Sequence, residues 1–460
     1  MDFTSFTFLI IIGLFFVGYV LVCYRFSRFH LGYIAVTSLF IYALWSPSSL
    51  LVLIYVIIVC YLSVYYFQNT ENRSYKILWF SIVLLLLPLL GFKYTVFIQH
   101  SFGFEVFDAS HWFLPLGISF YIFTGMALLF DVFNKKETKR MGLKEVVTLI
   151  SYWPHLAAGP ILRSNFMTNH KNRLKFKESY IKGLLFIAGG FAKKVFIADN
   201  LGAYVNHNLA QGIADMDSIT ALLTILGFGG QIYADFSGYS EMAIGFSILI
   251  GYQIPANFNY PYSAKSIGEF WHRWHISLST WFRDYIYIPL GGNKKGTSRW
   301  VLNVLLVFIV SGLWHGASNG FLVWGAVHGV LIIVQKLTAH FYQFKLSFLS
   351  WLVTFILVNL AWSFFLLDID SAVQILTIIL TPSLWFNFEL NTLYYTIPVV
   401  FFMFVLWLDH WFKYYTVNNE NEVVVFELRG KKATLLYVWS LFTIALFFSG
   451  TSLPFLYFEF

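Results

Sequence analysis

Residues 301–335 read VLNVLLVFIVSGLWHGASNGFLVWGAVHGVLIIVQ, and this stretch contains no Asp, Glu, Lys or Arg. Within this stretch, the side chains that titrate near neutral pH are those of His315 and His328. At about 1.5 Å per helical residue, His315 lies roughly 24 Å beyond Arg299, still inside an apolar slab about 30 Å thick. A titratable group is costly there unless it has a partner or a function, so His315 is the first candidate for chemistry. The alternative is a buried histidine that a backbone carbonyl satisfies.

The whole chain shares this apolar character. It is 58% hydrophobic and 12% charged, against about 25% charged in an ordinary soluble protein, and its mean hydropathy is +0.68. The sequence therefore predicts an all-α, polytopic membrane protein with about 10–12 transmembrane helices in a single domain, 1–460. The clearest apolar runs are Phe6–Tyr24, Leu31–Trp45, Leu50–Phe67, Ile77–Leu90, Phe113–Phe130, Trp300–Leu313, Phe321–Val334, Phe348–Leu367, Thr396–Leu408 and Leu435–Phe448.

The centre of the chain differs from its ends, because Gly, Pro, His and charged residues interrupt its apolar segments. We therefore divide the domain into N-terminal helices (1–110), a catalytic core (111–335) and C-terminal helices (336–460). Short apolar pieces predict buried half-helices or re-entrant segments, which membranes tolerate where protein covers them. These pieces are Gly183–Ala192, Ile219–Phe228 and Ala372–Leu380.

The charge of the chain fits a membrane setting. The net charge is +7, carried by basic clusters between apolar runs, which is typical of cytoplasmic loops facing anionic lipid. A nucleic-acid partner would require a soluble basic face, and the sequence shows none. Cys23 and Cys60 lie within or at the end of apolar runs, so they predict neither a disulfide framework nor a metal site.

The segment Glu269–Tyr285 is the densest polar and aromatic stretch of the chain. Treated as one helix, it places Trp271, Trp274, Leu278 and Trp281 on one apolar stripe, with His272 and His275 beside it. Two interpretations stay open. The segment is either an interfacial helix, with tryptophans at the headgroup level, or a helix that forms a site.

Three further residues have plainer interpretations. Along one straight helix, thirteen residues separate His328 from His315 by about 20 Å, although Ser318–Gly320 could fold the chain back; we favour a structural role for His328. His155 follows Pro154 in a broken segment, where it lines a cavity or caps a kink. No Gly-x-Ser-x-Gly elbow frames the serines after Asp235, which predicts a buried, hydrogen-bonded support rather than a triad.

Several segments in a fixed order resemble the membrane-bound O-acyltransferase (MBOAT) family, and within it the bacterial alginate and peptidoglycan O-acetyltransferase branch. The resemblance extends over nearly the whole chain. The segments that carry it are Leu114–Tyr121, Trp153–Pro160, Lys193–Asn200, Asp235–Ser240, Asn257–Tyr262, Glu269–Tyr285 with Ile288–Gly292, Ser311–Ala317, Trp324–Gly329 and Phe455–Phe460.

The resemblance implies a catalytic histidine at His315, in Leu313-Trp314-His315-Gly316, and a second active-site residue at His275. It also implies a helical fold around a tunnel in the bacterial inner membrane, acetyl-CoA as the acyl donor, and no permanently bound cofactor. An esterase-like periplasmic acetyltransferase would be the partner that receives the acetyl group. The acceptor would be an extracytoplasmic polysaccharide, with peptidoglycan ahead of alginate or another exopolysaccharide.

Two other functions remain as alternatives: D-alanyl transfer to teichoic acid, and proton-coupled transport through buried histidines. A transporter predicts inverted repeats, and the sequence shows none. For the acetyltransferase, Trp274, Trp314 and Asp235 complete the expected site. The phosphates of coenzyme A would be attracted by Lys193 and Lys194, or by Arg273 or Arg283. Of these we keep the two arginines, which lie inside the motif rather than in a loop.

Overall fold

The computed structural model describes residues 6–24, 26–102, 113–136, 139–168, 176–338, 347–381, 415–417, 423–425 and 454–456. These residues are mostly helical. Two three-residue strands, β1 (Tyr415–Val417) and β2 (Val423–Val425), pair antiparallel. The chain is an all-α, polytopic membrane protein, as the sequence predicts. Contacts divide it into two compact units.

The first unit contains residues 1–188 and 239–255. Its helices pack through α3 against α4, α6 and α7, and through α2 against α7. The helices of this unit are α1 (Phe6–Tyr19), α2 (His30–Trp45), α3 (Leu50–Asn69), α4 (Tyr75–Leu89), α5 (Thr95–Phe102), α6 (Ile118–Phe133), α7 (Leu143–Ser151), α8 (Asn165–Thr168) and most of α9 (Phe176–Ala192).

The second unit contains residues 189–238 and 256–456. The π-helix η6 (Lys193–Ala198) precedes its first α-helix. The remaining helices are α10 (Asp199–Gln211), α11 (Ser218–Ile250), α12 (Ile267–Arg273), α13 (Ile276–Phe282), α14 (Thr297–His315), α15 (Asn319–Thr338), α16 (Ser347–Ala361), α17 (Ser363–Leu366) and α18 (Ile369–Leu380). The end of α11, from Tyr239, is counted with the first unit.

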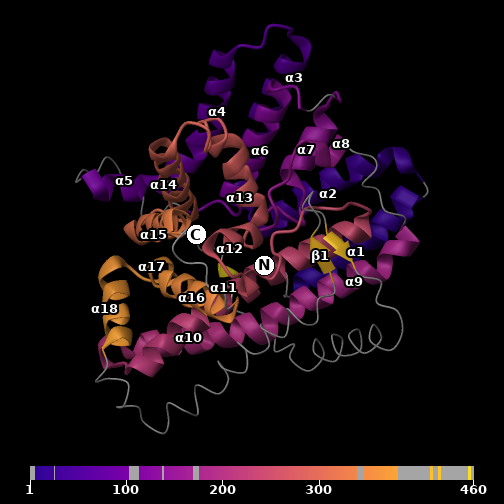
Figure 1. Cartoon of the computed structure of the whole chain (residues 1–460). Helices are drawn as coiled ribbons and strands as arrows, with labels where there is room; N and C mark the ends of the chain where they lie inside the picture. The colour runs from indigo at the N-terminus through magenta and orange to yellow at the C-terminus, as the bar shows by residue number, and fades with distance from the viewer. Residues whose placement is uncertain are drawn as a thin grey trace. The chain divides into compact units, whose positions relative to one another are not determined.

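Helices α14 and α15 form a tight hairpin, which Figure 1 shows side by side. Glycines let the two backbones touch. A Cβ atom on Gly312 would lie 2.2 Å from the carbonyl oxygen of Phe321, and one on Gly325 would lie 2.3 Å from that of Phe308. The chain does fold back after His315, through Gly316–Ser318, so His315 and His328 come from adjacent helices.

Six helical segments in the described ranges are long and apolar enough to cross a membrane. They are Pro47–Asn69, Tyr75–Gln99, Ser218–Ile250, Thr297–His315, Asn319–Thr338 and Ser347–Leu366. Four shorter apolar helices, Thr7–Cys23, His30–Trp45, Ile118–Phe133 and Ile369–Leu380, match further runs. The predicted runs Thr396–Leu408 and Leu435–Phe448 lie outside the described residues. The count of 10–12 transmembrane helices and the three-part division of the chain stay predictions.

The prediction for Ile219–Phe228 is wrong. This segment is not a half-helix but the first part of α11, a single helix of 33 residues in all. The polar residues that follow it do not end the helix, because Asp235, Ser237 and Glu241 are buried within the protein rather than exposed to lipid. A helix covered by protein can carry polar groups that a lipid-facing helix cannot.

Candidate active site

The segment Glu269–Tyr285 is broken at its centre, so its interpretation as one helix is wrong. Helix α12 ends at Arg273, Trp274 is extended, and His275 adopts the left-handed conformation with φ 43° and ψ 54° before α13 begins at Ile276. A left-handed backbone is uncommon for any residue but glycine, and strain of this kind clusters at functional sites. The break therefore prevents the continuous tryptophan stripe that a single helix would have formed.

Backbone hydrogen bonds to an upstream loop explain the break. The amide of Ile276 donates to the carbonyl of Asn257 at 2.9 Å, and the amide of Asn259 donates to the carbonyl of Arg273 at 3.0 Å. The Ser277 hydroxyl also donates to Asn257 Oδ1 at 2.6 Å. The loop therefore binds the chain on both sides of His275 and replaces backbone hydrogen bonds that a continuous helix would have made internally.

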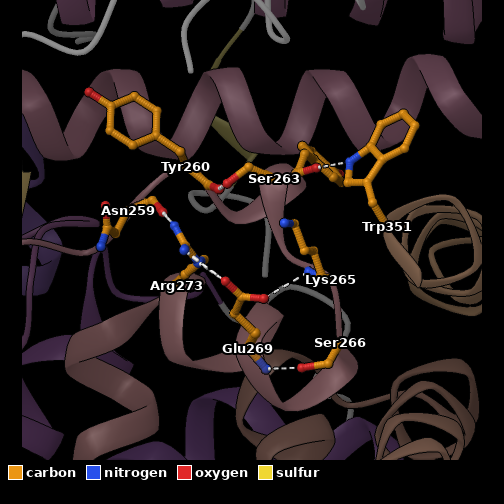
Figure 2. A network of polar contacts seen from close by, with 9 residues as sticks. Asn259, Tyr260, Ser263, Lys265, Ser266, Glu269, Arg273 and Trp351 are labelled. Carbon is orange, nitrogen blue, oxygen red and sulfur yellow. Dashed lines mark hydrogen bonds and ion pairs between the residues drawn. The ribbon is translucent and has the colours of Figure 1, made fainter. Parts of the chain in front are cut away.

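A polar network holds the end of α12 (Figure 2). Arg273 donates to Glu269 Oε1 at 2.7 Å and to the carbonyl oxygen of Asn259 at 3.0 Å. Glu269 Oε2 accepts from the amide of Lys265 at 2.8 Å, and the Glu269 amide donates to the Ser266 hydroxyl, which caps the helix. Arg273 thus fixes the loop that holds His275. Its predicted contact with the acyl donor stays a prediction.

The structure brings His275 and His315 together, both within the second unit. Their ring centroids lie 6.4 Å apart, and their residues are 0% and 2% exposed. His315 is the last residue of α14, where the extended Gly316 ends the helix. Trp314 contacts both rings, with centroid separations of 5.6 Å to His275 and 4.8 Å to His315.

Aromatic side chains enclose the two histidines. Phe236 of α11 meets the His275 ring edge-on at 4.6 Å, and Trp324 and Phe365 each meet the His315 ring at 5.1 Å. This enclosure keeps water from the imidazoles. Burial lowers the pKa of His275 to about 3, so its imidazole is neutral at physiological pH.

Trp274, at the break, packs against Phe258, Phe270 and Trp362, with ring centroids 5.0–5.4 Å away. It therefore belongs to the wall that supports His275.

Arg283 lies apart from this wall. Its side chain is more than half exposed and is paired with its neighbour Asp284 at 2.8 Å. His155, by contrast, belongs to the first unit, where its Nε2 lies 3.3 Å from the carbonyl oxygen of Leu149.

His328 and Trp324 are also part of the enclosure, which the sequence did not predict. The Trp324 ring lies 5.1 Å from both His315 and His328, and Trp271 Nε1 donates to His328 Nδ1 at 3.3 Å. The signal was present in the sequence. Trp324 and His328 are four residues apart, so a helix places them on one face.

Asp235 belongs to a buried charged cluster. Lys194 Nζ lies 2.8 Å from Asp235 Oδ1 and 2.9 Å from Asp199 Oδ1. Burial would lower the pKa of Lys194, but these two carboxylates raise it above its usual value, so the ammonium stays charged. Segment 454–456 closes the cluster, since the Leu456 amide donates to Asp235 Oδ2 at 2.9 Å and Lys194 donates to the Pro454 carbonyl. The structure thus makes Asp235 a buried support.

Comparison with known proteins identifies the family. Residues 31–369 match the membrane-bound O-acyltransferase family. The chain belongs to this family. Within the described ranges, no three His, Cys, Asp or Glu side chains gather in a way that could hold a metal ion.

Several individual members of the family are similar in sequence to this chain. The chain is 40% identical over 289 residues to the probable alginate O-acetylase AlgI of Pseudomonas putida, covering 61% of this chain and 59% of that protein. It is 34% identical over 383 residues to the peptidoglycan O-acetyltransferase of Helicobacter pylori, covering 75% and 72%. The teichoic acid D-alanyltransferase of Bacillus subtilis is 31% identical over 231 residues, covering 47% and 58%. The match to the alginate relative thus spans less than two thirds of its length.

Proposed function

We propose that this chain is a membrane O-acetyltransferase that moves acetyl groups from cytoplasmic acetyl-CoA across the membrane to an extracytoplasmic polysaccharide. The observation that carries the proposal is the buried pair His275 and His315, whose rings lie 6.4 Å apart within aromatic walls. Acyl transfer from a thioester to an alcohol needs a base that works near neutral pH and a dry, ordered pocket.

In this mechanism His315 removes the proton from the attacking group or carries the acetyl group briefly itself. His275, neutral at physiological pH, orients His315 or stabilises the developing oxyanion. Trp274 and Trp314 line the substrate path, and Asp235 supports it from α11. The enclosure excludes water, which would otherwise hydrolyse the thioester.

Peptidoglycan is the acceptor we favour, with alginate or another exopolysaccharide next. The peptidoglycan relative aligns over more of this chain than the alginate relatives do. In this proposal the protein lies in the bacterial inner membrane, and a periplasmic esterase-like acetyltransferase takes the acetyl group from the tunnel. That partner would hold the polysaccharide.

D-alanyl transfer is the second candidate, because a teichoic acid D-alanyltransferase is among the relatives. That alignment covers less than half of this chain, so acetyl transfer is the stronger proposal. Mass spectrometry of wall material separates the two, since an acetyl ester and a D-alanyl ester differ in mass.

The test is His315→Ala in the native host, at the expression level of the wild type. We expect O-acetyl esters to disappear from the wall or capsule polysaccharide, as in a deletion strain. His207→Ala, at an exposed position on α10, is the matched control and should retain the esters. Normal acetylation in a well-expressed His315→Ala strain would refute the proposal.

A further inference from the structure

His328 borders the enclosure that surrounds His315. It follows Trp324 by four residues on α15, and both residues are 0% exposed. The Trp324 ring lies between the two histidines and meets each nearly edge-on, at 88° to His315 and 70° to His328. A group that reaches His315 past Trp324 would therefore come close to His328.

A tryptophan fixes the proton position on His328. An indole N–H can only donate, so the bond from Trp271 Nε1 to His328 Nδ1 requires a lone pair on Nδ1. In a neutral imidazole the proton then resides on Nε2. His328 is therefore held as a neutral hydrogen-bond donor whose free N–H is at Nε2.

Two donors in this region have no acceptor within the described part of the chain: His328 Nε2 and Trp324 Nε1. Buried N–H groups in folded proteins nearly always have an acceptor. These two exceptions lie in contacting side chains, and one of them, Trp324, packs against His315; we take them to indicate that a bound molecule supplies the acceptor.

We propose that His328 Nε2–H and Trp324 Nε1–H bind the carbonyl oxygen of the acyl group during transfer, which makes His328 a catalytic residue. This inference rests on the proposed function and assigns the oxyanion to these two groups, leaving the orientation of His315 to His275.

The attacking hydroxyl oxygen bonds to the acyl carbon, its proton passes to His315, and the carbonyl electron pair moves onto the oxygen that the two N–H groups hold. The C=O bond then re-forms, the C–S bond breaks, and the thiolate leaves with its electron pair and takes the proton from His315. Neutral donors suit this step, because they bind most strongly when charge develops on the oxygen.

The experiment uses membrane vesicles that contain the full-length chain and its native partners, with radiolabelled acetyl-CoA as the probe. Maximal transfer per molecule and the half-saturating acetyl-CoA concentration are measured separately. His328→Leu should lower maximal transfer about 100- to 1000-fold, as loss of an oxyanion donor does, with the half-saturating concentration changed less than about twofold. Trp324→Phe keeps the ring, removes the N–H and should also lower maximal transfer. His328→Gln restores an N–H and should recover part of it.

The matched control is His30→Gln, which replaces a buried histidine whose ring nitrogens lie 2.7 Å and 3.4 Å from the hydroxyls of Tyr19 and Tyr252. It should transfer acetyl groups normally. If His328→Leu and Trp324→Phe retain maximal transfer within about threefold, the inference is wrong. It is equally wrong if both lose only thermal stability and His328→Gln rescues nothing. If the wild-type protein transfers no more label than His315→Ala does, the proposed function itself is wrong.

Discussion

At the scale of single residues, the left-handed backbone of His275 decides which replacements the position accepts. Asparagine adopts this conformation readily, whereas a β-branched residue does so only at a cost of about 1–3 kcal/mol. We expect His275→Asn and His275→Val both to lower acetyl transfer, and only His275→Val to lower the melting temperature as well.

The control for that comparison is His272→Val, three residues earlier at an exposed position on α12. It should change the melting temperature little. Equal melting temperatures for His275→Asn and His275→Val, followed by fluorescence in detergent, would show that the backbone at this position is not constrained.

His155 makes the fold sensitive to acid. Burial lowers its pKa to about 4, although the hydrogen bond with the Leu149 carbonyl opposes this, while an unfolded histidine has a pKa near 6.5. Between these values the unfolded chain binds a proton that the folded chain does not, so the free energy of unfolding falls as the pH drops from about 6.5 to about 4. At about 1.4 kcal/mol per pKa unit, the loss reaches a few kcal/mol.

We therefore expect His155→Gln to flatten the decline of the melting temperature between pH 7 and pH 4.5. His275, whose pKa is also lowered, keeps part of the decline in place. The exposed His207→Gln variant should follow the wild-type curve, and an unchanged curve for His155→Gln would argue against a neutral, buried imidazole at residue 155.

At the scale of elements, the α14–α15 hairpin depends on Gly312. A methyl group there would lie 2.2 Å from the backbone oxygen of Phe321, which cannot move without shifting α15. Gly312→Ala should cost about 1–3 kcal/mol of stability and separate His315 from Trp324, with at least a tenfold loss of transfer. The control is Gly32→Ala on α2, where a Cβ atom meets nothing within 4 Å; it should fold and work normally. If both variants match the wild type, the helices do not pack as closely as described.

The charged cluster joins η6, α10 and α11. Lys194→Met would leave the buried carboxylate of Asp235 and the partly buried carboxylate of Asp199 without their cation, at an expected cost of about 3–5 kcal/mol. The double variant Lys194→Met/Asp235→Asn should recover part of this loss, because one uncompensated charge is removed. Melting temperatures measure both effects, with Lys295→Met at an exposed loop position as the control. A stable Lys194→Met single variant would contradict the ion pairs.

The net charge of +7 over the whole chain favours binding of the negatively charged phosphates of acetyl-CoA. Arg283 is more than half exposed, so it can meet a phosphate. We expect Arg283→Gln to raise the half-saturating acetyl-CoA concentration, more at low ionic strength than at high, because salt screens exposed charges. Arg273→Gln should do the same and also loosen the loop that holds His275. Lys294→Gln serves as the control. If both arginine variants keep the wild-type half-saturating acetyl-CoA concentration, the two arginines serve only membrane topology and structure and do not bind the donor.

The apolar composition predicted the helical membrane fold, because composition is a local property of a chain, whereas the pairing of His275 with His315 was implied by the resemblance to the MBOAT family. The sequence did not predict the break at His275, since that break depends on backbone bonds to Asn257 and Asn259 in a separate loop. The sequence also offered Lys194 as a phosphate ligand. Its carboxylate partners, of which Asp235 is 41 residues away, follow only from the tertiary structure.

The closure of the charged cluster also has a consequence in time. The Leu456 amide that binds Asp235 lies 221 residues further along the chain. At about 5–20 residues per second, the ribosome needs roughly 10–45 s to synthesise that interval. During this time α11 must enter the membrane with Asp235 lacking its last partner. Lys194 and Asp199 are synthesised before Asp235, so the ion pairs can form first. They can then stabilise Asp235 during membrane insertion until residues 454–456 are synthesised.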